Sequence, residues 1–236
     1  MRHLHVIFDL DDTLYPERSF ALSGFRAAAR VAVERLSLAT EAAERMAAHM
    51  ARLLDEGHRG NLFGLALAAE HAAPAAGDVA AIHEAYRAHT PERLDLFEDG
   101  RWVLDYYARE GARMGDIGLI TDGHHVMQAS KVAALGIAPR FREIVFTGAL
   151  GPNRAFFKPH PRAFELMAAA LGDDTDHFVY VGDNPSKDFV APNAMGWTSV
   201  WIDRPGGIHH GAPVAEKGAP QITIRSLREL PEALAR

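Results

Sequence analysis

Short apolar runs alternate with longer helical patterns along most of the chain. The first run, residues 3–8, ends directly in carboxylates and predicts a buried strand. Further strands are predicted at residues 117–120, 144–146, 178–181, 198–202 and 222–224. Helices are predicted between them, over residues 97–109 and 226–234 and starting near His125, Pro161 and Ser186. Single strands separated by helices predict an α/β fold with a doubly wound, parallel, Rossmann-like sheet.

Residues 19–89 show a different pattern, in which Ala, Leu, Glu, Arg and Met recur at helical spacing. Breaks near residues 38–40, 57–60 and 74–77 divide this segment into four predicted helices. The segment interrupts the alternation after the first strand, so we expect an inserted all-helical domain over the strand ends, where open α/β sheets bind ligands. The predicted domains are a core of residues 1–15 and 91–236 and a helical cap of residues 16–90.

Composition narrows the class of protein. The 236 residues include 25 Lys and Arg against 31 Asp and Glu, a net charge of −6, which argues against a nucleic-acid partner. No apolar run approaches the ~18 residues of a membrane span, and the early aspartates interrupt any signal peptide. We therefore expect a cytoplasmic protein with no membrane partner. The absence of cysteine excludes disulfides, thiolate metal sites and a cysteine nucleophile. The sequence does not predict an oligomeric state.

The first predicted strand is followed by Asp9-Leu10-Asp11-Asp12-Thr13. The alternation of side chains along a strand would place Asp9 and Asp11 on one side of it, so that two carboxylates share one site. A turn that simply ends the strand is the alternative, and side-chain to backbone hydrogen bonds would explain Asp12 and Thr13.

Three further polar segments fall at predicted strand ends, which parallel strands bring together. The first holds Thr121 with the backbone N–H groups of Asp122 and Gly123, which together can cradle an anion. The second holds Lys158, and the third, Gly-Asp-Asn-Pro-Ser-Lys-Asp, holds Asp183 and Asp188. The competing interpretations are a helix cap for Thr121 and Asp188 and a solvated loop for Lys158.

These four segments resemble, in order, the motifs of the haloacid dehalogenase superfamily of hydrolases: DxDxT, a Ser or Thr, a Lys, and GDxxxxD. The helical insertion is similar to the family's first class of cap. The resemblance implies that Asp9 is the nucleophile, that Asp11 is the general acid and base, and that Thr121 and Lys158 bind the phosphoryl group.

The resemblance further implies a Mg²⁺ ion held by Asp9, Asp183 and the backbone carbonyl of Asp11. Thr13 and Asp188 are expected to support the site, Asp188 by orienting Lys158 or a metal-bound water. Charge counting favours the same cation independently. Four converging aspartates and a phosphate dianion carry about six negative charges, and each like-charge pair at about 4 Å costs ~4 kcal/mol at an effective dielectric near 20. By the same reasoning, neighbouring anions are expected to raise the pKa of Asp11, which suits a proton donor.

The expected function is Mg²⁺-dependent hydrolysis of a small phosphorylated metabolite, such as a sugar phosphate, phosphoglycolate or a nucleoside monophosphate. A phosphomutase of the β-phosphoglucomutase type shares all four motifs and is the main alternative. Haloacid dehalogenation is disfavoured, because the family's dehalogenases lack an acidic residue at the position of Asp11. A non-catalytic binding module would not need the complete set of polar residues.

Overall fold

The computed structural model describes residues 3–58, 60–71, 74–110, 115–172 and 176–235. The chain divides into two compact units, one formed by Met1–Pro16 and Asp95–Arg236 and the other by Glu17–Leu94. Each unit has its own cluster of buried apolar side chains, so each is described by itself. Within these ranges, no helix is long and apolar enough to cross a lipid bilayer.

The first unit is built on a six-stranded parallel sheet with the order β3-β2-β1-β4-β5-β6. The strands are β1 (Leu4–Phe8), β2 (Ile117–Thr121), β3 (Glu143–Phe146), β4 (His177–Gly182), β5 (Thr198–Ile202) and β6 (Ile222–Ile224). The chain order reverses at β1, which makes its carboxyl end a topological switch point where such sheets bind ligands. This topology confirms the predicted doubly wound parallel sheet.

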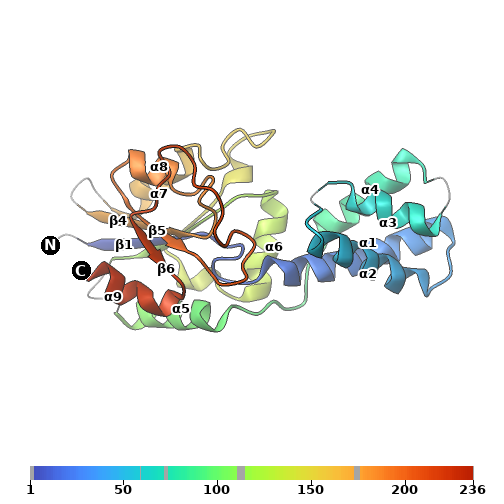
Figure 1. Cartoon of the computed structure of the whole chain (residues 1–236), viewed down its shortest axis with the longest axis horizontal. Coiled ribbons are helices and arrows are strands. Elements are labelled where there is room, and N and C mark those ends of the chain that lie inside the picture. Colours follow the sequence, from blue (N-terminus) through green and yellow to red (C-terminus); the bar gives the residue numbers. More distant parts are fainter. Residues whose placement is uncertain (1–2, 59, 72–73, 111–114, 173–175, 236) are drawn as a thin grey trace. The chain divides into compact units, whose positions relative to one another are not determined.

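Helices cover both faces of this sheet, as its apolar strands require. Figure 1 shows α7 (Arg162–Leu171) and α8 (Val190–Ala194) on one face and α5 (Glu98–Glu110) and α9 (Leu230–Leu234) on the other. The unit also contains α6 (His125–Leu135) and the short 3-10 helices η1 (Ala138–Arg140), η2 (Thr147–Ala149) and η3 (Leu227–Glu229). Ile7 of β1 and Phe164 and Met167 of α7 belong to one cluster of buried apolar side chains.

Two predicted helices differ from the observed ones. The helix expected near Ser186 begins only at Val190, because residues 184–188 form a turn held by their own side chains. The Asn184 side-chain oxygen accepts hydrogen bonds from the Ser186 N–H (3.0 Å) and the Ser186 hydroxyl (2.6 Å). The helix expected over residues 226–234 is divided into η3 and α9, and Pro231 stands in the first turn of α9.

The second unit consists of α1 (Glu17–Leu36), α2 (Ala42–Asp55), α3 (Leu62–Glu70) and α4 (Ala76–Ala88). α1 packs against α2 and α4, and α2 packs against α3. The small side chains on α1, among them Ala28, Ala29 and Ala32, are buried and let the other helices approach closely. Residue 59, inside the second predicted break, lies outside the described residues.

Candidate active site

The predicted site residues gather at the carboxyl edge of the sheet. Asp9 follows β1 directly, Thr121 is the last residue of β2, and Asp183 follows β4. Because β2 and β4 are the two neighbours of β1, these three strand ends lie side by side. Lys158 comes from the loop between η2 and α7. The sheet topology thus brings together side chains that are far apart in the sequence.

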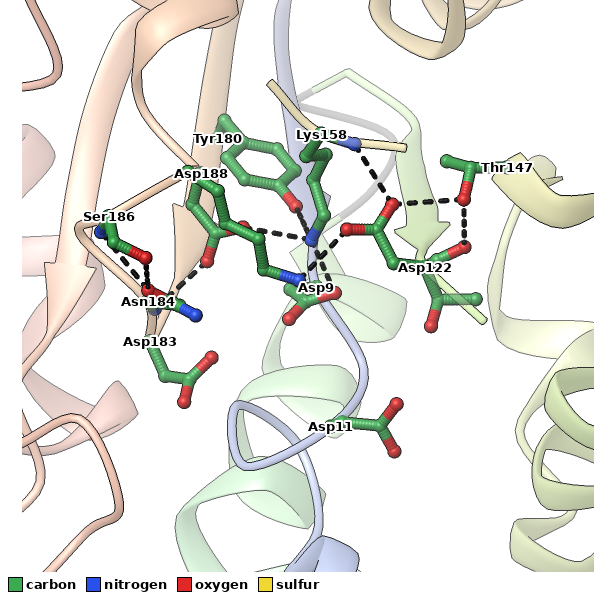
Figure 2. Close-up of polar contacts among 12 residues, drawn as sticks. Asp9, Asp11, Asp122, Thr147, Lys158, Tyr180, Asp183, Asn184, Ser186 and Asp188 are labelled. Carbon is green, nitrogen blue, oxygen red and sulfur yellow. Dashed lines mark hydrogen bonds and ion pairs between the residues drawn. The ribbon is translucent and has the colours of Figure 1, made fainter. Parts of the chain in front are cut away.

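Lys158 lies at the centre of a buried polar cluster, and its side chain is 0% exposed. Its Nζ lies 2.8 Å from Asp9 Oδ1, 2.9 Å from Asp188 Oδ1 and 2.8 Å from the Tyr180 hydroxyl oxygen (Figure 2). The contacts with Asp9 and Tyr180 are hydrogen bonds, whereas the contact with Asp188 is an ion pair. Burial opposes the positive charge, but Asp188 and Asp9 raise the pKa of Lys158 well above its ordinary value. Lys158 is therefore a fixed cation in this site.

Three carboxylates converge beside this lysine. Asp9, Asp183 and Asp188 each offer an oxygen, and these oxygens lie within 4.8 Å of one another. Burial raises the pKa of Asp9 to about 7 against the attraction of Lys158, and repulsion from Asp188 adds to the rise. Burial and repulsion from Asp188 and Asp9 also raise the pKa of Asp183 well above its ordinary value. We call this set the carboxylate cluster. When all three carboxyl groups are ionised the cluster has an excess of negative charge, and its oxygen donors fit a hard divalent cation such as Mg²⁺.

The Asp188 carboxylate connects Lys158 with the backbone that follows β4. One of its carboxylate oxygens pairs with Lys158 Nζ, and the other accepts a hydrogen bond from the Asn184 N–H at 2.9 Å. The carboxylate packs so tightly on Gly182 that a Cβ at that residue would lie 2.5 Å from Asp188 Oδ2. The Trp201 indole N–H donates to the Asp183 carbonyl at 2.9 Å. These contacts fix the backbone that presents Asp183.

The Asp122 side chain links β2 to the Lys158 loop. Its Oδ1 accepts hydrogen bonds from the Thr147 hydroxyl (2.9 Å) and the Lys158 N–H (3.1 Å), and its Oδ2 pairs with Lys187 Nζ at 2.8 Å. Burial opposes the charge, but Lys158 and Lys187 lower the pKa of Asp122. From the sequence, only the backbone N–H of Asp122 was expected to take part in the site. In the structure its carboxylate also binds Thr147, Lys158 and Lys187.

Asp11 lies apart from the carboxylate cluster (Figure 2), and its hydrogen-bond partners are different residues. β1 ends at Phe8, so the strand alternation does not extend to this residue. Its carboxylate accepts hydrogen bonds from Lys131 Nζ (2.7 Å), the Tyr15 hydroxyl (2.7 Å) and Gln128 Nε2 (2.8 Å). Burial opposes its charge, but Lys131 and the three hydrogen bonds lower its pKa. The prediction of a raised pKa for Asp11 was therefore wrong.

The remaining predicted residues lie close to the same edge. Thr121 is fully buried, and its hydroxyl oxygen accepts a hydrogen bond from Gln128 Nε2. Gly123 has φ of 140°, a conformation that favours glycine, and a Cβ there would meet the Gln128 side chain at 2.9 Å. Thr13 is buried, and among the described residues its hydroxyl has no hydrogen-bond partner, while its carbonyl accepts from Arg204 at 2.8 Å.

Sequence reasoning missed several polar side chains at this edge: Gln128, Lys131, Thr147, Tyr180 and Lys187. One signal was available for the pair on α6. Gln128 and Lys131 are three residues apart in a helix that starts close after Thr121, so they share a face near the end of β2. Tyr180 lies within an apolar strand pattern, where an aromatic residue is normally interpreted as core.

Comparison with known proteins agrees with this architecture. The haloacid dehalogenase-like hydrolase family model matches residues 4–196. A glyceraldehyde 3-phosphate phosphatase from Methanopyrus kandleri is 31% identical over 228 residues, which cover 95% of this chain and 94% of that protein. A phosphoserine phosphatase from Thermus thermophilus is 31% identical over 144 residues, which cover 60% of this chain and 53% of that protein.

A solved structure extends the comparison to the fold. The HAD-hydrolase YfnB from Bacillus subtilis, which is bound to magnesium, aligns over 100% of both chains with a TM-score of 0.64 and 18% identity. At that identity the similarity concerns the fold alone. The family match, by contrast, spans most of the sequence and includes all four polar segments. This chain belongs to the haloacid dehalogenase-like hydrolase family.

Proposed function

We propose that this chain is a Mg²⁺-dependent phosphatase of small phosphorylated metabolites, with Asp9 as nucleophile and Asp11 as general acid and base. The observation that carries the proposal is the buried Asp9 carboxylate, 2.8 Å from Lys158 Nζ, within the carboxylate cluster at the switch point of the sheet. The similar glyceraldehyde 3-phosphate phosphatase and phosphoserine phosphatase support the reaction type and the size of the substrate.

In the first step, a carboxylate oxygen of Asp9 attacks phosphorus and the bond from phosphorus to the ester oxygen breaks. The leaving oxygen takes the electron pair of that bond and a proton from Asp11, which has to take up this proton before the step because Lys131 lowers its pKa in the free site. In the second step, ionised Asp11 accepts a proton from water, and the water oxygen attacks the phosphorus of the aspartyl-phosphate. The bond from phosphorus to Asp9 breaks, which restores the Asp9 carboxylate and releases phosphate.

Lys158 changes its partner during this cycle. In the structure its ammonium group donates hydrogen bonds to Asp9 and Tyr180 and forms an ion pair with Asp188. When the Asp9 carboxylate becomes an acyl phosphate, this carboxyl group loses its negative charge, and the phosphoryl oxygens become the stronger acceptors beside Lys158. The Thr121 hydroxyl and the backbone N–H groups of Asp122 and Gly123 bind the same oxygens.

A cation is required by the charge of the site. Asp9, Asp122, Asp183 and Asp188 contribute four negative charges when ionised, against two positive charges on Lys158 and Lys187. Mg²⁺ held by Asp9, Asp183 and the carbonyl of Asp11 would neutralise the charge between the carboxylates and the phosphoryl oxygens.

The test is phosphate release from a panel of phosphorylated metabolites, measured with Mg²⁺ or EDTA for the wild type and Asp9→Asn in parallel. Release that needs Mg²⁺ and disappears in Asp9→Asn supports the proposal. The best esters identify the substrate class. Transfer of the phosphoryl group back to a second hydroxyl of the substrate, with no free phosphate, would instead favour the phosphomutase alternative.

A further inference from the structure

The side chains that hold Asp11 come largely from one helix. Lys131 and Gln128 of α6 are each 1% exposed, and they donate to the two different oxygens of the Asp11 carboxylate. A lysine ammonium removed from water in this way costs free energy unless it is paired and hydrogen-bonded. The pairing with Asp11 at 2.7 Å offsets that cost. Two polar side chains, Lys131 and Gln128, are therefore buried on α6 in positions where apolar side chains would carry no such cost.

Gln128 contacts two predicted site residues with a single amide nitrogen. Its Nε2 carries two protons and donates to Asp11 Oδ2 and to Thr121 Oγ1. The orientation of the amide is determined by Asp11, since the opposite orientation would set the amide oxygen against a carboxylate, acceptor against acceptor. Because the Thr121 oxygen receives this bond, the Thr121 hydroxyl proton remains able to donate to another acceptor.

The turn after β2 is built closely around the same amide. Gly123 leaves room for it, because a Cβ at that residue would lie 2.9 Å from Gln128 Cδ and its φ of 140° disfavours other residues. Among the described residues, Gln128 Oε1 has no hydrogen-bond partner. The Gln128 amide thus uses its nitrogen to donate two hydrogen bonds, while its oxygen accepts none among the described residues. This arrangement indicates that the amide orients Asp11 and Thr121.

We propose that Gln128 and Lys131 are positioning residues, which fix the direction of the Asp11 carboxylate and the donor role of the Thr121 hydroxyl toward one phosphoester. The inference rests on the proposed phosphatase function and assigns no chemistry to either side chain. Lys131 acts through Asp11, and Gln128 acts through Asp11 and Thr121. Their effect is on the geometry of groups that contact the substrate, where a displacement of about 1 Å can cost ~100-fold in rate.

The test is a double-mutant cycle measured by phosphate release. Lys131→Met and Gln128→Met keep the approximate volume of each side chain and remove its polar end. Each is combined with Asp11→Asn, and turnover is measured on p-nitrophenyl phosphate, whose leaving group needs no proton, and on the best alkyl ester of the metabolite panel. Val132→Ala is the matched control, since Val132 is 3% exposed on the same helix and lies outside the proposed site. Thermal unfolding of every variant reports whether it is folded.

We expect Lys131→Met to lower kcat on the alkyl ester about 100-fold with little change in KM. It should slow the first burst of p-nitrophenol release less, because that leaving group needs no proton, and it should add no further loss of kcat in the Asp11→Asn background. Gln128→Met should behave in the same way but retain some loss in that background through Thr121. Lys131→Arg, which keeps a cationic donor, should restore most of the activity that Lys131→Met loses, and Val132→Ala should be additive with Asp11→Asn.

Two results would overturn the inference, and they are distinguishable. If the wild type releases phosphate but Lys131→Met and Asp11→Asn are additive, Lys131 does not act through Asp11 and the positioning role is wrong. If folded wild type with Mg²⁺ releases no phosphate from any ester, the proposed function has failed and the inference fails with it.

Discussion

Asp9 and Asp11 are two residues apart in the sequence, yet their electrostatic surroundings are opposite. Asp9 belongs to the carboxylate cluster, where burial and Asp188 raise its pKa to about 7 against the attraction of Lys158. Burial also opposes the charge on Asp11, but Lys131 and three hydrogen bonds lower its pKa. The first region has an excess of negative charge when its carboxyl groups are all ionised. In the second region the Asp11 carboxylate forms an ion pair with Lys131.

The difference shows that two aspartates separated by one residue can lie in two different electrostatic environments. Asp9 and Asp11 therefore do not form a single pair of neighbouring carboxylates. The carboxylate cluster is arranged to receive a cation and a phosphoryl group. The Asp11 site is complete within the protein and holds its carboxylate in one direction. The predictions below test this distinction, starting with the largest expected effect.

Lys158→Met should destabilise the protein most. It leaves Asp9 and Asp188 buried without their shared cation, and removal of one partner from a buried ion pair typically costs about 3–5 kcal/mol. Urea unfolding in EDTA measures the change in free energy of unfolding.

Lys187→Met is the matched control, because its side chain is 31% exposed and its partner is Asp122. It should cost clearly less than Lys158→Met. Equal effects of the two substitutions would contradict the assignment of Lys158 as the central cation.

Asp11→Asn should lower kcat on an alkyl phosphate by about 100- to 10,000-fold, the usual contribution of general acid and base catalysis. Because Lys131 then loses its ion pair with Asp11, the free energy of unfolding should fall as well. Steady-state kinetics with circular dichroism as a folding control checks both effects. Turnover of the alkyl ester close to that of the wild type would exclude Asp11 from proton transfer.

Mg²⁺ should stabilise the wild type and not the Asp183→Asn variant. A ligand at 100 times its Kd raises the free energy of unfolding by about 2.7 kcal/mol. In EDTA the Asp183→Asn variant should be more stable than the wild type, since the substitution removes the repulsion between Asp183 and the carboxylates of Asp9 and Asp188. Thermal unfolding across a Mg²⁺ titration makes this measurement, and an equal response of both proteins would place the ion elsewhere.

Asp99 provides a reference carboxylate outside the site. It accepts hydrogen bonds from Arg204 (2.8 Å), the Ser226 hydroxyl (3.0 Å) and the Leu227 N–H (2.9 Å), and although burial opposes its charge, these partners lower its pKa. A lowered pKa stabilises the folded state above the ordinary value of about 3.9, and the stabilisation is lost as pH falls through the folded pKa.

Asp99→Asn should therefore cost about 1.5–3 kcal/mol at neutral pH and progressively less below about pH 4. Urea unfolding from pH 7 to pH 3 measures this convergence of variant and wild type. A cost that stays constant over that range would show that the Asp99 charge is not the source of the stabilisation.

The sequence was sufficient to predict the sheet, because each strand is a short apolar run and each connection contains a helical pattern. It was insufficient near Ser186, where the side chains of Asn184 and Asp188 hold a turn that competes with a helix. It was also insufficient at Pro231, which divides the last helical segment.

The polar residues at strand ends could be located from the sequence, since parallel strands end at a common edge. Their electrostatics could not. The pKa of Asp11 depends on Lys131 and Gln128, which come from α6 more than a hundred positions later and have no motif of their own. Tyr180 and Thr147 likewise acquire their roles only through packing against Lys158 and Asp122.

The most direct test of the central claim is to look for the phosphoryl group on Asp9. Asp11→Asn should form the aspartyl-phosphate from p-nitrophenyl phosphate but hydrolyse it slowly, because no general base activates the water. Acid quenching during turnover, followed by peptide mass spectrometry, should then find the phosphoryl group on Asp9 and at higher occupancy in Asp11→Asn than in the wild type. A phosphoryl group on another side chain, or phosphate release with no modified Asp9 in either protein, would contradict the account.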